Sequence, residues 1–152
     1  MCGIVGYVGD REAQAVLISG LKRLEYRGYD SAGIATMSQK HQVTLLRAKG
    51  KVAELEARLL DNKTDDKIGI GHTRWATHGA PTTSNAHPHA TGEVALVHNG
   101  IIENFKTLRD ELIARGRTFE SETDTEVFAH LVSERIEAGD SPQDAVKAVL
   151  PQ

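Results

Sequence analysis

The residue best suited to act as a nucleophile is the only cysteine, Cys2, which stands directly after Met1. Removal of Met1 would leave Cys2 with a free α-amine beside its thiol. An α-amine titrates near ~7.7–8.0, so a useful fraction is neutral at physiological pH and can accept the thiol proton. Nucleophile and base would then share one residue, as with an N-terminal threonine. A lone cysteine is more often a small buried apolar residue, and Met1–Cys2–Gly3 alone leaves both interpretations open.

Two further segments carry groups that recognise or stabilise negative charge. Arg74 stands beside Trp75 in a loop rich in threonine and glycine. Its guanidinium can grip a carboxylate with two parallel hydrogen bonds, or it can stack on the indole in a structural role. Asn99–Gly100 follows a predicted strand and precedes a predicted helix. A tight turn is the commoner role of this pair, whereas the Asn99 amide and the Gly100 N–H can also form an oxyanion hole.

Acidic and histidine side chains complete the set of candidates. Asp124 opens a predicted helix, where the helix dipole favours a carboxylate, and this carboxylate can also hold a substrate ammonium group. Five histidines lie within one stretch and are candidate metal ligands: His72, His78, His87, His89 and His98. Zinc ligands usually share a helix face or a knuckle, and no acidic or cysteine partner stands at such a spacing. We therefore favour hydrogen bonds that order the loop over metal binding.

Composition narrows the class of protein. The 152 residues have a formal net charge of -3 with scattered basic residues, which argues against a nucleic-acid-binding surface. The length suits one domain, and 39% hydrophobic with 26% charged residues is ordinary for a soluble globular protein. No apolar run is long enough to cross a bilayer, and the first residues lack the pattern of a secretory signal. A single thiol fits a reducing compartment, so we expect a cytoplasmic protein without membrane or nucleic-acid partners.

Hydrophobic periodicity predicts an α+β domain with mostly antiparallel strands, and these elements must position the candidate side chains. Strands are predicted at 4–8, 33–37, 43–46, 68–72 and 94–98, with a hairpin between the second and third. Helices are predicted after a cap at Asp10, around 52–59 and 105–112, from a capping box at Thr123 and Glu126, and from Ser141–Pro142. Residues 73–92 form a long polar loop of the kind that is usually either functional or disordered.

These separate signals coincide in six sequence blocks that follow one another along essentially the whole chain. The blocks are MCGIVG at 1–6, LEYRGYDSAG at 24–33, HTRWATHG at 72–79, NAHPH at 85–89, HNGIIEN at 98–104 and SETDTE at 121–126. In these blocks the sequence resembles the N-terminal glutaminase domain of the glutamine–fructose-6-phosphate aminotransferases. Other amidotransferases that start with a cysteine carry looser versions of the blocks. Segments 26–30 and 74–78 look like the sugar-phosphate enzymes.

The resemblance implies a fold and a role for each candidate residue. The fold would be the N-terminal-nucleophile αββα sandwich, in which helices cover both sides of two stacked antiparallel sheets. Cys2 would attack the side-chain carbonyl of glutamine, and Asn99 with Gly100 would form the oxyanion hole. Arg74, Thr77 and His78 would bind the α-carboxylate, and Asp124 with the Gly100 backbone would bind the α-ammonium. Trp75 would belong to the loop that closes over glutamine. Arg27 would be a support near the nucleophile.

The implied reaction is hydrolysis of glutamine to glutamate and ammonia through a cysteine thioester, with no metal or cofactor. Residues 1–152 would form the N-terminal part of the glutaminase domain, whose sheets would continue after Gln152. Sugar-phosphate isomerase domains outside this chain would bind fructose 6-phosphate and convert it to glucosamine 6-phosphate, in an enzyme expected to be a homodimer. Two alternatives stay open: a non-catalytic glutamine-binding regulatory module on the same fold, and the glutaminase domain of a different amidotransferase of this type.

Overall fold

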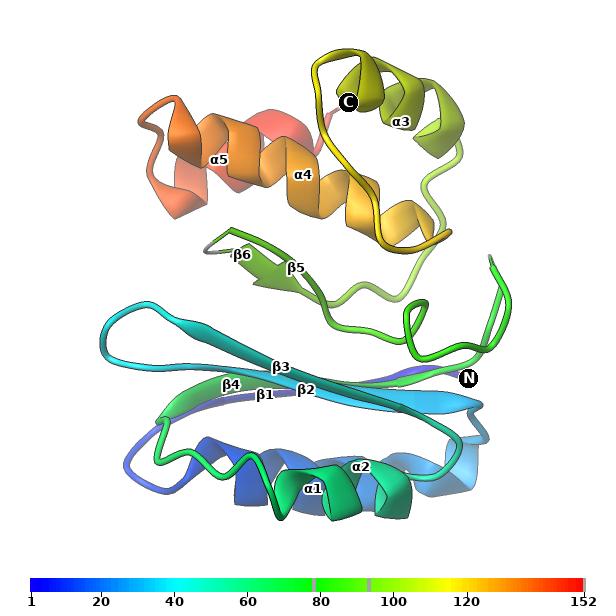
Figure 1. The fold of residues 1–152 in the computed structure, drawn as a ribbon, viewed down its shortest axis with the longest axis vertical. Coiled ribbons are helices and arrows are strands. Elements are labelled where there is room, and N and C mark those ends of the chain that lie inside the picture. Colours follow the sequence, from blue (N-terminus) through cyan, green and yellow to red (C-terminus); the bar gives the residue numbers. More distant parts are fainter. Residues whose placement is uncertain (78, 93, 152) are drawn as a thin grey trace.

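The computed structural model describes residues 1–77, 79–92 and 94–151. They form four layers in the order helices, sheet, sheet, helices (Figure 1). Every strand pairing among the described residues is antiparallel. The α+β prediction and the αββα arrangement implied by the resemblance are therefore confirmed.

The larger sheet has the strand order β1–β4–β2–β3. Its strands are β1 (Gly3–Val8), β2 (Ser31–Met37), β3 (Val43–Lys49) and β4 (Ile68–Arg74). The β2–β3 hairpin was predicted, whereas the insertion of β4 between β1 and β2 is a long-range pairing that local sequence patterns do not reveal. The register of β1 on β4 pairs Gly3 with Thr73. The start of β1 therefore lies against the end of β4.

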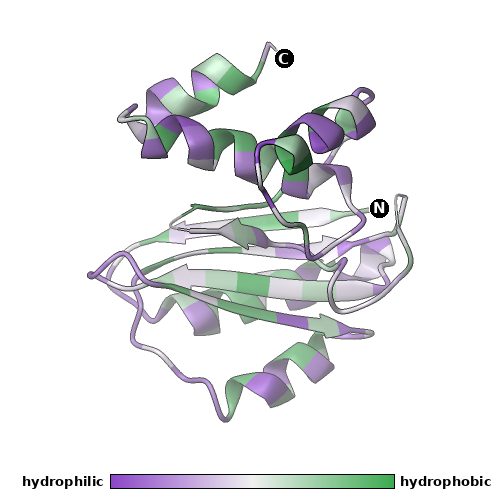
Figure 2. Cartoon of the chain, turned by 45° about the horizontal axis from the view of Figure 1, so that its top comes forward, coloured by the Kyte–Doolittle hydropathy of each residue, from purple (hydrophilic) through white to green (hydrophobic). Residues whose placement is uncertain are grey.

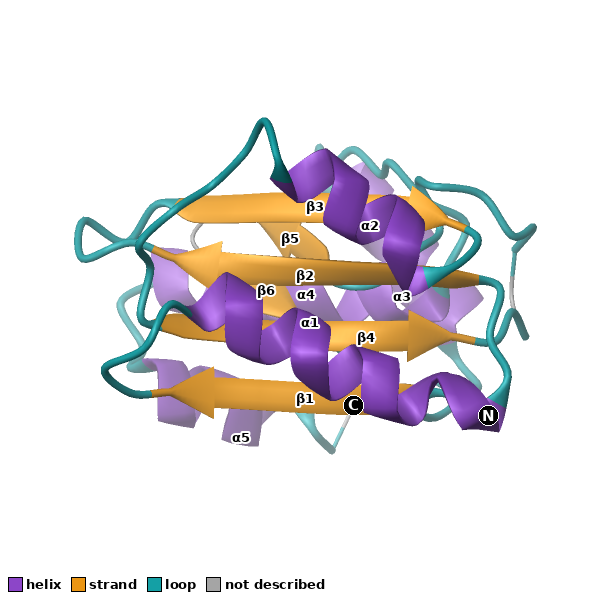
Figure 3. Ribbon diagram, turned by 90° about the horizontal axis from the view of Figure 1, so that it is seen from below, coloured by secondary structure: helices purple, strands orange, loops and turns teal. Residues whose placement is uncertain are grey.

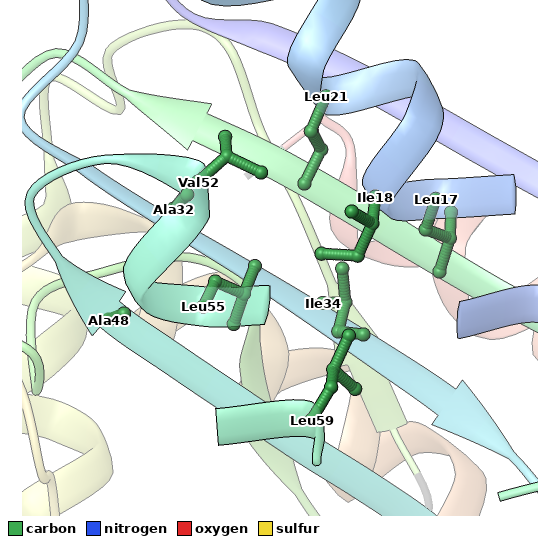
Figure 4. Packing of buried hydrophobic residues seen from close by; sticks show 9 residues of the cluster. All are labelled: Leu17, Ile18, Leu21, Ala32, Ile34, Ala48, Val52, Leu55 and Leu59. Atoms are coloured by element: carbon green, nitrogen blue, oxygen red, sulfur yellow. The ribbon is translucent and has the colours of Figure 1, made fainter. Parts of the chain in front are cut away.

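Two helices, α1 (Ala13–Leu24) and α2 (Val52–Leu59), cover one face of this sheet (Figure 3). Their apolar stripes meet alternate residues of the strands in one buried cluster (Figure 4), formed by Leu17, Ile18, Leu21, Ala32, Ile34, Ala48, Val52, Leu55 and Leu59. Removing this apolar area from water supplies the main stabilisation of these two layers. The predicted cap at Asp10 is wrong, because α1 begins at Ala13 and the residue at its N-cap is Glu12, whose side chain makes no capping bond. A short 3-10 turn, η1 (Glu25–Arg27), follows α1.

The other side of the molecule holds a two-stranded sheet under three helices. The strands are β5 (His89–Thr91) and β6 (Val94–Leu96), and the helices are α3 (Phe105–Ala114), α4 (Asp124–Glu137) and α5 (Pro142–Val149). Hydrophilic and hydrophobic residues alternate along these helices (Figure 2), and their apolar sides share a second buried cluster, which includes Leu112, Val127, Leu131, Val132, Ala145 and Val149. Within the described ranges, no helix has both the length and the apolar character needed to span a bilayer.

Two predicted helix caps can be compared with the N-termini of α4 and α5. Ser141 caps α5 as predicted, since its hydroxyl accepts a hydrogen bond from the N–H of Asp144. Thr123 does stand at the N-cap of α4, but the predicted capping box is wrong because the Thr123 side chain makes no capping bond. Glu126 instead accepts hydrogen bonds from the backbone N–H groups of Glu120 and Ser121. Its carboxylate therefore holds the segment before the helix rather than the helix end itself.

Gly33 is a place where β2 is in direct contact with the segment that contains His87. A Cβ atom at Gly33 would lie 2.2 Å from the carbonyl oxygen of His87 and 3.0 Å from that of Leu46. The segment that contains His87 therefore packs directly on β2, with no room for a side chain between them. Gly6 in β1 differs, because a Cβ atom there would meet nothing within 4 Å.

We expect Gly33→Ala to lower the free energy of unfolding by about 1–3 kcal/mol, the usual cost of forcing an extra methyl group into a packed interior. Gly6→Ala is the matched control, and it should be neutral or stabilising by up to about 1 kcal/mol, because alanine loses less backbone entropy on folding than glycine. Urea denaturation followed by circular dichroism measures both values. Equal stability of the two variants would contradict the direct packing of the His87 segment on β2.

Candidate active site

A cleft of about 420 Å³ lies where β1 begins and β4 ends. The N-terminus of the chain lies at this end of the sheet (Figure 1). Its volume is within the usual range for small-molecule sites. The lining brings together the candidate residues from distant parts of the sequence, namely Cys2, Arg27, Arg74, Trp75, Thr77, Asn99, Gly100 and Asp124. The remaining candidate, His78, lies outside the described residues.

The thiol of Cys2 faces the first residue of the loop that follows β4. The backbone N–H of Trp75 donates a hydrogen bond to Sγ, with 3.2 Å between nitrogen and sulfur. The Sγ atom also lies 3.7 Å from the carbonyl oxygen of Trp75, so the thiol contacts both polar groups of this residue. The amine of Met1 donates to the carbonyl oxygens of Arg27 and Gly28 at 3.1 and 3.2 Å. The turn that contains Arg27 therefore borders the start of the chain.

Arg74, the last residue of β4, contributes a positive charge to the cleft. It is only 3% exposed, and its guanidinium donates to the carbonyl oxygens of Gly79 and Ala80 at 3.4 and 3.3 Å. Burial lowers the pKa of Arg74, while the nearby carboxylates of Asp30 and Asp124 act in the opposite direction. A guanidinium stays protonated under all these influences, so the cleft keeps a permanent cation.

Asp30 positions both residues that flank Trp75, and the sequence analysis gave it no role. Its Oδ2 accepts a hydrogen bond from the N–H of Ala76 at 2.5 Å, and its own N–H donates to the carbonyl oxygen of Arg74 at 2.8 Å. The Ser31 hydroxyl donates to the second carboxylate oxygen at 2.9 Å. These bonds hold the peptide whose N–H points at Cys2. Asp30 lies within one of the six blocks, which was the only signal for it.

Asn99–Gly100 lies in the segment between β6 and α3 rather than in a hairpin turn between strands. The Asn99 Oδ1 atom is 2.7 Å from Nε2 of His72, and Nδ2 donates to the carbonyl oxygen of Cys2 at 3.4 Å. The side-chain amide is therefore held next to the candidate nucleophile. This placement favours the oxyanion-hole interpretation over a simple turn.

Asp124 supplies the negative charge of the cleft. It is the first residue of α4 and is 5% exposed. Its Oδ2 accepts a hydrogen bond from the N–H of Ile102 at 2.8 Å, which ties the start of the helix to the segment after Asn99. The cleft thus combines a thiol, a cation, an anion and amide donors, which is the set needed to bind a zwitterion and attack its carbonyl group.

Asn85 and Glu122 join the loop after β4 to the segment before α4. The amide nitrogen of Asn85 donates to the Ala80 carbonyl oxygen at 2.9 Å and to the Glu122 carboxylate at 3.0 Å. Its amide oxygen accepts from the Glu122 N–H at 2.9 Å, and the side chain is buried. The loop next to Arg74 and the segment that carries Asp124 are therefore fixed relative to each other. Neither residue was a candidate from the sequence, because no local spacing predicts a pairing between distant loops.

The histidines form a buried row of rings. His72 stacks on His87 with 4.4 Å between ring centroids, and His87 meets the edge of His89 at 4.6 Å. Burial lowers the pKa of His72 and of His89 to about 4, and lowers the pKa of His87 further, so all three rings are neutral at physiological pH. Among the described residues, no three histidine, cysteine or acidic side chains converge as a metal ion would require. His89 instead lies 2.8 Å from the hydroxyl of Thr123, next to Asp124.

Comparison with known proteins assigns the family. Residues 36–141, which are most of the chain, match a family described as the glutamine amidotransferase domain. The chain belongs to this family. The matched range of the glutamine amidotransferase domain includes Arg74, Asn99 and Asp124, while Cys2 lies before it.

Curated relatives of this glutamine amidotransferase domain are named glutamine–fructose-6-phosphate aminotransferase (isomerizing). The protein from Zymomonas mobilis is 59% identical over 150 residues, which cover 99% of this chain and 24% of that protein. The protein from Acinetobacter baylyi is 54% identical over 152 residues, which cover 100% of this chain and 25% of that protein. The chain therefore spans about a quarter of the length of these relatives.

Solved structures share the fold of this glutamine amidotransferase domain. Glutamine phosphoribosylpyrophosphate amidotransferase from B. subtilis, complexed with ADP and GMP, has a TM-score of 0.80 and 29% identity, covering 99% of this chain and 32% of that chain. A structure described as the allosteric regulatory enzyme of purine biosynthesis has a TM-score of 0.81 and 29% identity, covering 99% and 33%. These matches confirm the N-terminal-nucleophile fold that the sequence resemblance implied.

We expect the contribution of Glu126 to the stability of this glutamine amidotransferase domain to disappear in acid. Burial would raise the pKa of Glu126, but the nearby His130 ring and the hydrogen bonds from Ser121 and from the backbone together lower it to about 2. An unfolded glutamate titrates near ~4.3, so the stabilisation is complete above that pH and is lost as the pH falls toward about 2. The stability difference between the wild type and Glu126→Gln should therefore narrow over this range.

Urea denaturation at a series of pH values measures this difference. The control is Glu54→Gln, which removes an exposed carboxylate from α2 and should give a small difference that does not change with pH. A Glu126→Gln difference that stays constant from neutral pH to acid would contradict the role assigned to the carboxylate.

Proposed function

We propose that this glutamine amidotransferase domain hydrolyses glutamine to glutamate and ammonia, with Cys2 as the N-terminal nucleophile after removal of Met1. The observation that carries the proposal is the convergence of four groups on one cleft: the Cys2 thiol, the Asn99 amide, the Arg74 guanidinium and the Asp124 carboxylate. Glutamine matches them, because it has a carboxylate, an ammonium group and an amide carbonyl at side-chain distance.

Binding would use the two charges. The α-carboxylate of glutamine pairs with Arg74, which offers two parallel donors, and Thr77 and His78 complete that side. The α-ammonium pairs with the Asp124 carboxylate and the backbone at Gly100. Arg74 and Asp124 are both nearly fully buried, so their hydrogen bonds to substrate are weakly screened by solvent. Trp75 is 54% exposed at the mouth of the cleft, which suits a residue that closes over bound glutamine.

The chemical step begins with the thiol proton. The α-amine of Cys2 accepts it, through a water molecule, and the Trp75 N–H stabilises the resulting thiolate. Sulfur attacks the amide carbon, and the oxyanion that forms accepts hydrogen bonds from Asn99 Nδ2 and the Gly100 N–H. When the intermediate collapses, the C–N bond breaks, the amine returns its proton to nitrogen, and ammonia leaves a thioester. Water then attacks the thioester through a second oxyanion, and glutamate and the thiol are released. Arg27 would support the turn beside the reacting amine.

The destination of the ammonia is proposed from the relatives. Their name specifies glutamine and fructose 6-phosphate, and this chain matches about a quarter of their length. Residues 1–152 would therefore act as the N-terminal part of a glutaminase domain, and fructose 6-phosphate would bind to further domains that convert it to glucosamine 6-phosphate. Homodimeric assembly of that longer enzyme stays a prediction. Because the chemistry needs a reduced thiol, the proposed setting is the cytoplasm.

The first experiment follows the thiol. Intact mass should show loss of Met1, and an electrophilic diazoketone analogue of glutamine should add one covalent mass at Cys2. Cys2→Ala should lose both labelling and glutaminase activity, by about 10³-fold or more, because the nucleophile is absent. Glutamine binding that depends on Arg74 without any turnover by the wild type would overturn the proposal and favour a non-catalytic glutamine-binding module.

The second experiment tests recognition of the ammonium group. Asp124→Asn should raise KM for glutamine by about 10- to 100-fold, because a hydrogen bond to a charged group is lost. Asp110→Asn, which removes an exposed carboxylate from α3, is the control and should leave KM unchanged. Steady-state kinetics of glutamate release measure both variants. An unchanged KM for Asp124→Asn would show that the ammonium group binds elsewhere.

A further inference from the structure

The side chain that contacts the amide oxygen of Asn99 is His72, which lies two residues before the end of β4. His72 is 1% exposed, and its Nε2 atom lies 2.7 Å from Asn99 Oδ1. From the sequence, His72 was one of five histidines for which hydrogen bonds that order the loop were favoured over metal binding. Its position is inside the wall of the cleft, where a polar side chain that contributes nothing would be costly to bury.

The pattern of donors around Asn99 determines how its amide is oriented. The Cys2 carbonyl oxygen can only accept, so the Asn99 atom 3.4 Å from it must be the nitrogen Nδ2. The oxygen Oδ1 therefore faces His72, and because this oxygen also only accepts, the proton of His72 must be on Nε2. The reversed amide would place two acceptor oxygens against each other. One imidazole tautomer and one amide orientation thus satisfy both contacts.

We infer that His72 is a positioning residue, which holds the Asn99 amide so that its nitrogen is presented to the cleft. The inference rests on the proposed function, in which Asn99 donates to the oxyanion. Nδ2 carries two hydrogens, and the contact with Cys2 uses one of them. The second hydrogen is left for the substrate oxygen. Without the His72 bond the amide is free to rotate, and a donor out of place is not available when the oxyanion forms.

The surroundings of His72 keep it in the required form. Its ring stacks on His87, whose two nitrogens are buried and have no hydrogen-bond partner in the described structure. Such a neighbour excludes water and offers His72 no competing partner. Burial lowers the pKa of His72 to about 4, against the opposite effects of Asn99 and of the His98 backbone, so a single proton occupies the ring at physiological pH. Nδ1 is buried without a hydrogen-bond partner in the described structure, so the contact with Asn99 favours the proton on Nε2. The row continues through His89 to Thr123, so the same rings connect the amide of Asn99 with the start of α4.

Three variants of His72 separate positioning from mere packing. His72→Gln keeps an N–H donor that can occupy the position of Nε2. The side chain of His72→Asn also carries a donor but is too short to reach Asn99, and His72→Leu carries no donor. We expect kcat of glutamine hydrolysis to fall by about 10²-fold in His72→Leu and His72→Asn, the scale of a displaced catalytic group. KM should change little, because Arg74 and Asp124 are untouched. His72→Gln should recover most of the lost kcat.

A double-mutant cycle tests whether the effect passes through Asn99. In an Asn99→Ala background, His72→Asn should cost less than about 3-fold in kcat, because the side chain that it orients is already gone. The folded and reactive fraction of each variant is counted by covalent titration with the diazoketone analogue, so that kcat refers to active sites. If His72→Leu does not fold, the comparison of His72→Gln with His72→Asn still decides the outcome.

The intact protein is used throughout, with the wild type and Cys2→Ala as references. If wild-type glutaminase activity does not depend on the Cys2 thiol, the proposed function fails. If that activity is present but His72→Asn matches the wild type in kcat, or His72→Gln is as slow as His72→Asn, only the positioning role fails. An undiminished effect of His72→Asn in the Asn99→Ala background would also overturn it, by showing that His72 acts by another route.

Discussion

The antiparallel pairing of β1 with β4 is the constraint on which the whole site depends. Its register sets Gly3 opposite Thr73, so the residue before β1 and the residues that end β4 must lie together. This single alignment places the Cys2 sulfur at the N–H of Trp75 and beside the buried charge of Arg74. A shift by one residue would turn the side chains of β1 to the opposite face and separate the thiol from the cleft. Helix α1 protects this register, because it packs on one face of both β1 and β4.

The buried charge of Arg74 has partners in the protein before any substrate enters. Arg74 is surrounded by Asp30, Asp124 and Glu122, and the backbone carbonyl oxygens of the loop after β4 accept its hydrogen bonds. Buried charges are tolerated only with such partners, because desolvation is otherwise too costly. The same partners hold the guanidinium in place. A zwitterionic substrate then enters a site whose charges are already oriented, which limits the entropy lost on binding.

The support for the site comes from polar groups that distant loops share. Asp30 holds the peptides around Trp75, and Asn85 with Glu122 joins the loop after β4 to the start of α4. The buried histidine row fills the space between the sheet and the second layer while remaining neutral. The lack of a side chain at Gly33 allows the backbone of His87, in this row, to lie directly on β2. The candidate catalytic and binding side chains thus lie on a framework in which Asp30 and Asn85 hold the loop after β4 and the segment before α4.

Sequence alone determined the α+β class, the β2–β3 hairpin, the helices and, through the six blocks, the residues that line the cleft. Those features depend on local periodicity or on residue identity, and both are written along the chain. The cap at Asp10 was predicted wrongly because α1 begins only at Ala13, with Glu12 at its N-cap. The capping box was predicted wrongly because His89 contacts the Thr123 hydroxyl and the N–H groups of Glu120 and Ser121 bind the Glu126 carboxylate. The place of β4, the Asn85–Glu122 pair and the contact of His72 with Asn99 required the tertiary structure. They join residues far apart in sequence, and only the packing of the layers decides which polar groups become partners.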